Sequence, residues 1–153
     1  MSQRIYLNGR FVDPADARVS VFDHGFLYGD GVFKGIRAYN GRVFRLGEHV
    51  ERLYRSAKAI MLDVPLSPEE LGQVILETCR LNDVESGYIR VVVSRGPGDL
   101  GIDPRNCREG ATVVVIADKL TMYPESMYEN GMAVITTATR RNSPHALDPG
   151  IKS

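Results

Sequence analysis

Short, largely apolar segments that flank turn residues predict two β-hairpins in the first third of the chain. Each hairpin is centred on an Asn-Gly pair, at residues 8–9 and 40–41. Asn-Gly accepts the positive φ angles of a type I′ turn, so each pair predicts a two-residue connection between antiparallel strands. The strands flanking the turns are expected at residues 5–7, 10–12, 32–39 and 42–46.

Helical periodicity follows in the middle of the chain. Between residues 46 and 61, apolar side chains recur at three- and four-residue spacing and share one helix face; they are Leu46, Val50, Leu53, Ala57, Ile60 and Met61. A second helix is predicted to start at Ser67, where Pro68 and Glu70 complete a capping-box pattern. Its inward-facing residues are expected to be Leu71, Val74, Ile75 and Thr78.

Strand patterns return after the helices, at residues 88–95, 111–118 and 132–139. Strands, two helices and further strands predict an α+β fold with a mainly antiparallel sheet and both helices on one face. We divide the chain into a small N-terminal domain at residues 1–118, a linker at 119–131, and the start of a larger domain at 132–153. One strand and an irregular tail are too little for a domain, so we expect the chain to be a fragment.

Charge balance and the length of the apolar runs argue against nucleic acid and membrane as partners. Lysine plus arginine equals aspartate plus glutamate, 19 each, whereas nucleic-acid-binding domains usually show a basic excess. The longest apolar run, at residues 113–117, is far shorter than the ~20 residues that a membrane span needs. Cys79 and Cys107 lack metal-ligand spacing and predict reduced thiols in a cytoplasmic protein.

Residues 23–52 form the densest candidate site. Glycines at positions 25, 29, 31 and 35 alternate with aromatic residues, and cations follow. This mixture suits a cavity for a flat, anionic ligand, although a packed hairpin would tolerate much of it. The aromatic residues Phe26, Tyr28 and Phe33 most often indicate core packing in such a chain.

Three cations allow both a functional and a structural interpretation. Arg52 is either a phosphate clamp or a solvated helix residue. Arg90 shares a strand face with Tyr88, and needs an anionic ligand, water or a carboxylate partner at a sheet edge. Lys152 is informative only if it lies in a cleft, where a lysine can act as a nucleophile or Schiff-base partner.

Taken together, these segments resemble the fold-type IV family of pyridoxal-phosphate enzymes, and most of all its branched-chain amino-acid aminotransferases. The resemblance extends along the whole chain, because five segments follow the order found in the family. They are residues 6–9, 24–37, 48–53, 88–90 and 150–153.

The resemblance implies a role for each candidate residue. Lys152 would bind the aldehyde of pyridoxal 5'-phosphate as a Schiff base, and its freed amine would move a proton during catalysis. Arg52 would hold the cofactor phosphate. The substrate pocket would be lined by Tyr28, Phe33, Tyr88, Arg90 and Tyr123, with Leu100 and Ile102 reaching the neighbouring subunit's site.

The implied reaction transfers the amino group of leucine, isoleucine or valine to 2-oxoglutarate. Its partners would be small amino acids and 2-oxo acids, and the enzyme would be a homodimer or a larger homo-oligomer. The alternatives are a D-amino-acid aminotransferase or an aminodeoxychorismate lyase of the same fold. A non-catalytic α+β interaction domain, in which Arg52 and Lys152 are surface charges, is a third interpretation.

Two departures from the family pattern qualify these expectations. Lys34 stands where the family signature usually has an acidic residue. The family's chain also continues past the lysine, where it supplies an Asn-Tyr pair, an acidic partner for the pyridine nitrogen and further phosphate donors. Because the cofactor is a weaker electron sink without that acid, residues 1–153 alone are expected to be inactive or nearly so.

Overall fold

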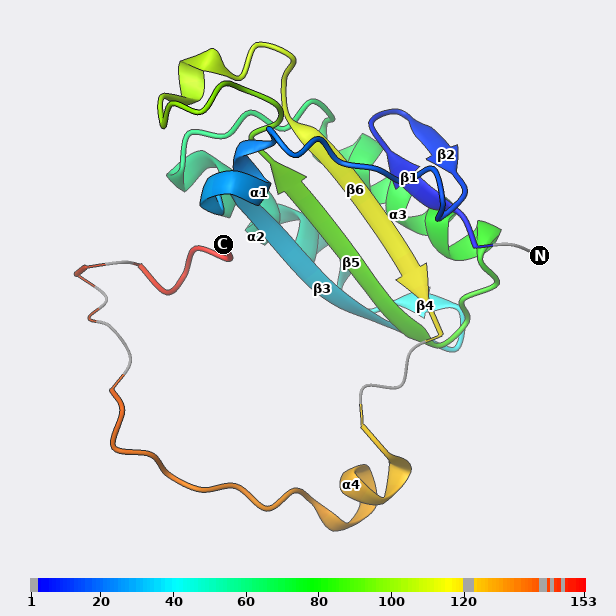
Figure 1. The fold of residues 1–153 in the computed structure, drawn as a ribbon. Coiled ribbons are helices and arrows are strands. Elements are labelled where there is room, and N and C mark those ends of the chain that lie inside the picture. Colours follow the sequence, from blue (N-terminus) through cyan, green and yellow to red (C-terminus); the bar gives the residue numbers. More distant parts are fainter. Residues whose placement is uncertain (1–2, 120–122, 141–142, 144, 147) are drawn as a thin grey trace.

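The computed structural model describes residues 3–119, 123–140, 143, 145–146 and 148–153. One antiparallel sheet has the strand order β2-β1-β6-β5-β3-β4 (Figure 1). The strands are β1 (Ile5–Leu7), β2 (Arg10–Val12), β3 (Gly31–Tyr39), β4 (Arg42–Val43), β5 (Gly87–Ser94) and β6 (Thr112–Asp118). The predicted α+β class is confirmed.

Both Asn-Gly turns form as the sequence predicts. Asn8 and Gly9 have φ angles of 46° and 90°, and Asn40 and Gly41 have 49° and 77°. The second hairpin is shorter than expected, because β4 stops at Val43 rather than continuing to residue 46. The chain leaves the sheet there to enter the first long helix.

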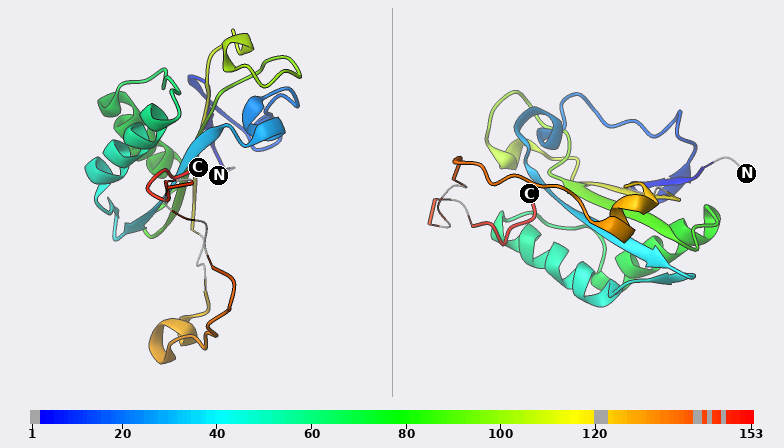
Figure 2. Two further views of the ribbon diagram at one scale, coloured as in Figure 1. Left: turned by 90° about the vertical axis from the view of Figure 1, so that its left-hand side faces the viewer. Right: turned by 90° about the horizontal axis from the view of Figure 1, so that it is seen from below.

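Two long helices, α2 (Leu46–Ala59) and α3 (Pro68–Leu81), cover one face of the sheet (Figure 2). The capping box at Ser67 and Glu70 is present, with both reciprocal hydrogen bonds. The first helix ends two residues earlier than predicted. Met61 lies beyond that end with φ 53° and is 83% exposed, so its assignment to the apolar face was wrong.

The core lies between these helices and the sheet. Alternate residues of β3 and β5 point into it, among them Val32, Ile36, Ile89 and Val91. They pack with buried residues of α2 and α3, which include Leu53, Leu71 and Ile75. We call the opposite side of the sheet the open face, and it carries the other set of alternating side chains.

A short helix that the sequence did not predict, α1 (His24–Tyr28), precedes β3. Its N-cap Asp23 is fully buried, and its Oδ2 accepts hydrogen bonds from the hydroxyls of Ser94 and Thr112 at 2.9 and 2.7 Å. These bonds tie α1 to the ends of β5 and β6. A second unpredicted element is a 3₁₀ turn at Pro104–Asn106.

The strand predicted at residues 132–139 is absent. This stretch has no regular structure, and Val134 and Ile135 are 82% and 88% exposed. A strand needs a neighbouring strand to satisfy its backbone groups, and no strand in the described part of the chain lies beside this one. The predicted linker contains a short helix, α4 (Glu125–Asn130), although residues 120–122 lie outside the described residues. The division into two domains stays a prediction.

None of the helices described in the structure is long and apolar enough to cross a lipid bilayer.

Candidate functional site

The last residues of the chain return to the sheet and dock between β3 and α2. The amide of Lys152 donates to the hydroxyl of Ser56 at 3.1 Å, and the amide of Phe33 donates to the carbonyl of Lys152 at 2.9 Å. This contact is possible because β4 pairs only with the far end of β3, at Ala38 and Tyr39. The backbone of β3 is therefore free at Phe33 to bind the returning segment.

The Phe33 ring on the open face is approached by two cationic groups. Lys152 Nζ lies 4.9 Å from the ring centroid, and Arg90 Cζ lies 4.7 Å from it. Arg90 also lies 5.5 Å from the centroid of the Tyr88 ring. Such cation–π contacts contribute about 0.5–2 kcal/mol, more when the cation is shielded from water. The structure thus brings together four predicted site residues from three distant segments.

Gly35 gives Tyr88 its position over β3. A Cβ atom built at residue 35 would overlap the Tyr88 hydroxyl and ring. The absence of a side chain at this position lets the tyrosine lie flat across the strand, beside Arg90. Any larger residue at position 35 would displace the Tyr88 ring from the open face.

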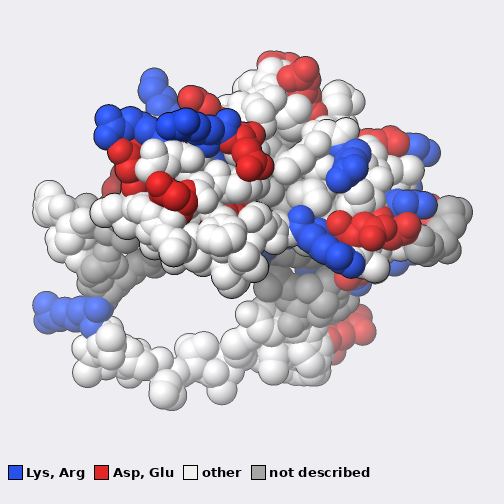
Figure 3. Space-filling model, turned by 45° about the horizontal axis from the view of Figure 1, so that its top comes forward, with Lys and Arg blue, Asp and Glu red and all other residues white. Residues whose placement is uncertain are grey.

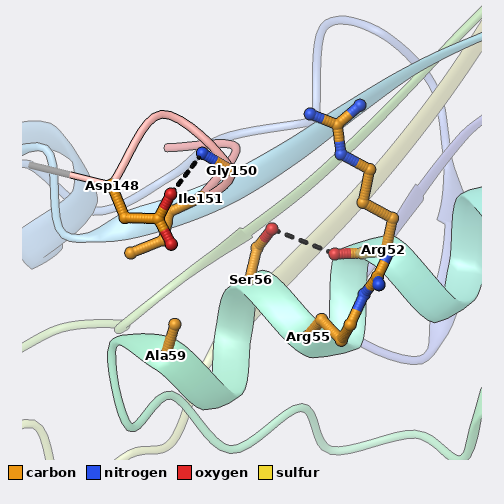
Figure 4. A pocket seen from close by; sticks show the side chains of 7 residues that line it. All are labelled: Arg52, Arg55, Ser56, Ala59, Asp148, Gly150 and Ile151. Carbon is orange, nitrogen blue, oxygen red and sulfur yellow. Dashed lines mark hydrogen bonds between the residues drawn. The ribbon is translucent and has the colours of Figure 1, made fainter. Parts of the chain in front are cut away.

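A cavity of about 390 Å³ lies between α2 and the returning segment. Arg52, Arg55, Ser56 and Ala59 line it from the helix, and Asp148, Gly150 and Ile151 line it from the tail (Figure 4). The Ser56 hydroxyl donates to the carbonyl of Arg52 at 2.9 Å, and Asp148 Oδ1 accepts the amide of Gly150 at 2.8 Å. In the part of the chain that the structure describes, neither arginine side chain has an ion-pair partner.

Lys34 of β3 and His49 of α2 do not line this cavity, but Lys34 is near enough to Arg52 and Arg55, which do line it, to feel their positive charge. The pKa of Lys34 is lowered chiefly by burial, and further by the charges of Arg52, Lys152 and Arg55. Burial also lowers the pKa of His49, and Lys34 adds to the effect while Glu48 opposes it. Protonated groups that are buried without a counterion are costly, so the region is arranged to accept an anion.

A phosphate monoester fits this set of donors. A guanidinium offers parallel N–H groups that match phosphate oxygens, and Arg52 is the arginine predicted for that task. Lys152 reaches the same region from the other wall, through the backbone contacts with Ser56 and Phe33.

Four other predicted site residues lie elsewhere. Tyr28 donates its hydroxyl to the carbonyl of Leu100 at 2.5 Å, and Leu100 and Ile102 are both largely exposed. Tyr123 belongs to the segment around α4, where its ring centroid lies 6.3 Å from that of Tyr128 (Figure 1). Within the described residues, none of the four makes a hydrogen bond or a ring contact with Lys152, and their role in the site stays a prediction.

The alternative interpretation of Phe26 and Tyr28 as core residues does not hold. Phe26 is 73% exposed and Tyr28 is 44% exposed, whereas Phe33 is partly buried on the open face. Both exposed rings belong to α1, a helix of five residues in which only His24 is buried.

Three residues at or near the site were not predicted from the sequence to have a role in it. Ser56 and Arg55 line the cavity, and four-residue spacing from Arg52 was the only signal for Ser56. Arg37 lies on the open face, two positions beyond Gly35, and its buried Nε has no hydrogen-bond partner. Alternation along β3 places Arg37 on the same face as Phe33, which could have singled it out.

The fold and this site together define an α+β domain in which a lysine docks beside a cationic cavity. The chain belongs to the amino-transferase class IV family, whose sequence profile matches residues 31–153.

Individual relatives agree with this assignment. The chain is 54% identical to a putative branched-chain-amino-acid aminotransferase of Methanocaldococcus jannaschii over 150 residues, which is 98% of this chain and 51% of that protein. It is 36% identical to a D-alanine aminotransferase of Staphylococcus haemolyticus over 137 residues, covering 87% of this chain and 47% of that protein. The chain thus spans about half the length of these curated relatives.

A solved structure confirms the fold. The branched-chain amino acid aminotransferase of T.th., complexed with N-(5'-phosphopyridoxyl)-L-glutamate, superposes with a TM-score of 0.72 at 41% identity. The match covers 78% of this chain and 41% of the other.

We predict that Ser56→Ala loosens the docked tail. The substitution removes the acceptor of the Lys152 amide, so peptides covering residues 148–153 should exchange amide hydrogens faster, by about fivefold for a bond of about 1 kcal/mol. Thr78→Ala is the matched control, because Thr78 makes the same bond to the carbonyl four residues earlier but lies in α3. Equal exchange in both variants would reject the docking role of Ser56.

Proposed function

We propose that the protein is a pyridoxal-phosphate-dependent aminotransferase that transfers the amino group of leucine, isoleucine or valine to 2-oxoglutarate. The observation that carries the proposal is the position of Lys152, held by Ser56 and Phe33 beside the cavity that Arg52 lines. The phosphopyridoxyl ligand named for the T.th. relative supports the choice of cofactor.

The chain's own residues divide the work of holding that cofactor. Arg52 would bind the phosphate through its guanidinium, and Lys152 would carry the aldehyde end on its Nζ. When bound, pyridoxal 5'-phosphate supplies an electron sink that makes the α-hydrogen of an amino acid acidic. Both groups are fixed to α2 or β3, so their separation is set by the fold.

Lys152 would also move the proton that this chemistry requires. As a free amine, the Nζ of Lys152 would carry the proton between the substrate α-carbon and the cofactor. The contact with the Phe33 ring limits the positions open to this amine. The ring also shields one side of Nζ from water.

The open face would recognise the substrate. Phe33 and Tyr88 offer aromatic surface to an aliphatic side chain, and Arg90 has no carboxylate partner among the described residues. β5 is a central strand, which removes the interpretation of Arg90 as a paired sheet-edge arginine. Arg90 would accept the second carboxylate of glutamate or 2-oxoglutarate.

The remaining parts of the proposal follow the family. The exposed Leu100 and Ile102 would complete the pocket of a neighbouring subunit, which makes the protein a homodimer or larger homo-oligomer. Residues 132–153 would open the cofactor-binding domain. The thiols of Cys79 and Cys107 are free, in keeping with a cytoplasmic protein.

A D-alanine aminotransferase is the second candidate, because relatives with that activity are up to 44% identical to part of this chain. The relative with the greater coverage and identity is of the branched-chain type, and the aromatic open face favours larger aliphatic substrates.

The position of the cofactor can be tested by chemical trapping. We expect borohydride reduction of the full-length gene product with pyridoxal 5'-phosphate to fix the cofactor on Lys152, because this amine is held beside the cavity. Peptide mass spectrometry gives the site, with Lys152→Ala as the negative control and the exposed Lys58 as the internal reference. Labelling spread over surface lysines would reject the enzyme assignment.

The choice between the two branches depends on the amino donor. We expect L-leucine to be a better donor than D-alanine with 2-oxoglutarate, by at least about tenfold in kcat/KM, since extra buried methylenes are worth about 1–3 kcal/mol. Coupled measurement of glutamate formation compares the two donors. A preference for D-alanine would move the protein to the other branch.

The role of Arg90 predicts a selective loss. Arg90→Gln removes a charge-assisted contact worth about 1.5–3 kcal/mol, so kcat/KM for 2-oxoglutarate should fall about ten- to a hundredfold. The half-reaction with L-leucine, which has no second carboxylate, should change much less. Equal losses in both half-reactions would show that Arg90 only supports the fold of the site.

A further inference from the structure

Lys34 is a buried lysine in an unusual position. It lies on the helix-facing side of β3, between the core residues Val32 and Ile36, and is only 4% exposed. Within the described part of the chain its side chain has no hydrogen bond and no ion pair. A lysine is almost never buried to this extent unless its charge is paired.

The surroundings of Lys34 increase its need for a counterion. Arg52 and Arg55 of α2, and Lys152 of the tail, all act on it as like charges. His49 of α2 adds to them whenever it is protonated, and its own pKa is lowered partly by Lys34. Glu48 acts on His49, whereas the groups that act on Lys34 within the described residues are all cations.

Asp148 is the acidic residue that lines the adjoining cavity. Its Oδ1 accepts the amide of Gly150, and it forms no ion pair with any of these cations in the described structure (Figure 4). Among the described residues, Arg52 and Arg55 line the cavity with Asp148 as its one carboxylate, and Lys34 and Lys152 add positive charge close by. A dianion bound there would relieve this imbalance.

We infer that Lys34 is a second phosphate-binding cation, which acts with Arg52 to neutralise the phosphate dianion of the cofactor. This inference rests on the proposed function. The two groups contribute differently, because a guanidinium directs paired hydrogen bonds whereas an ammonium acts as a compact point charge. A phosphate monoester carries close to two negative charges at neutral pH, which matches one charge from each residue.

Without an anion, the protonated amine of Lys34 lowers the stability of the folded protein. Its pKa is lowered from 10.5 in the folded state, so the protonated amine destabilises the fold at neutral pH. As the pH rises through the lowered value, the folded protein releases this proton before the unfolded chain does, and the penalty is relieved. Removing the amine should therefore stabilise the ligand-free fold at neutral pH, by an amount that shrinks as the pH approaches the ordinary lysine value.

The experiment compares two ligands that differ only in the phosphate. Pyridoxal 5'-phosphate and pyridoxal are titrated into the ligand-free, full-length gene product, and binding is followed by absorbance. The test variant is Lys34→Met, which keeps the length of the side chain without its charge. Lys58→Met is the matched control, because Lys58 is exposed on α2.

We expect Lys34→Met to weaken pyridoxal 5'-phosphate binding about ten- to a hundredfold and to leave pyridoxal binding unchanged. Competition by inorganic phosphate should weaken in parallel, and the affinity should depend less on salt. Lys34→Arg should restore most of the affinity, because it keeps the charge. The melting temperature of ligand-free Lys34→Met should exceed that of the wild type at neutral pH.

Three results would overturn the inference. Equal weakening of both ligands would show that Lys34 shapes the site without contacting phosphate, and unchanged affinity for both would show no role. Borohydride labelling on Lys34 itself would make it a reactive amine instead. If Lys34→Met does not fold, Lys34→Gln takes its place. The salt dependence of its affinity for pyridoxal 5'-phosphate then shows whether a phosphate contact has been lost. The proposed function fails separately, when the wild type does not label Lys152.

Discussion

The register between β3 and β5 determines which residues can form the site. It pairs Gly35 with Arg90 and Phe33 with Val92. Side chains alternate between the two faces of a sheet, so this register places Phe33 and Arg90 on the open face and Lys34 against α2. A slip of one residue would exchange the two sets, burying an arginine and exposing Ile89 and Val91. The buried aliphatic residues of both strands oppose such a slip, which means that core packing and site geometry are one constraint.

The second requirement is the free edge of β3. Because β4 is only two residues long, the backbone at Phe33 can receive the carbonyl of Lys152, and the hydroxyl of Ser56 completes the contact. With its backbone held in this way, Lys152 has its Nζ 4.9 Å from the centroid of the Phe33 ring. Figure 3 shows lysine and arginine side chains gathered in several separate patches on the outer surface. Of the candidate-site cations, Arg52 and Arg55 line the cavity, and Lys34 lies on the core-facing side of β3.

Features set by neighbouring residues could be predicted from the sequence, whereas features set by distant partners could not. The Asn-Gly turns and the Ser67 capping box depend on adjacent residues and form as expected. Helix α1 depends on Asp23, which is buried against Ser94 and Thr112, and no local pattern indicates such a contact. The strand predicted at residues 132–139 lacks a pairing strand in the described chain. For the site, the residues alone left both Arg52 and Lys152 open between a functional and a surface role, and the family resemblance singled them out. The sequence marked Lys34 as a departure from the family, but its burial depends on the register with β5.

The lysine at position 34 changes the balance between stability and binding in this site. An acidic residue there would pair with a neighbouring cation and stabilise the empty fold, but it would also repel a phosphate. A lysine destabilises the empty fold, because its charge is unfavourable among Arg52, Arg55 and Lys152. The same charge attracts a phosphate. Ligands stabilise a folded state in proportion to how much better they bind it than the unfolded chain. If Lys34 binds the phosphate as inferred, the free energy lost by burying it would be recovered in the complex, and the stability of this domain would be coupled to that ligand.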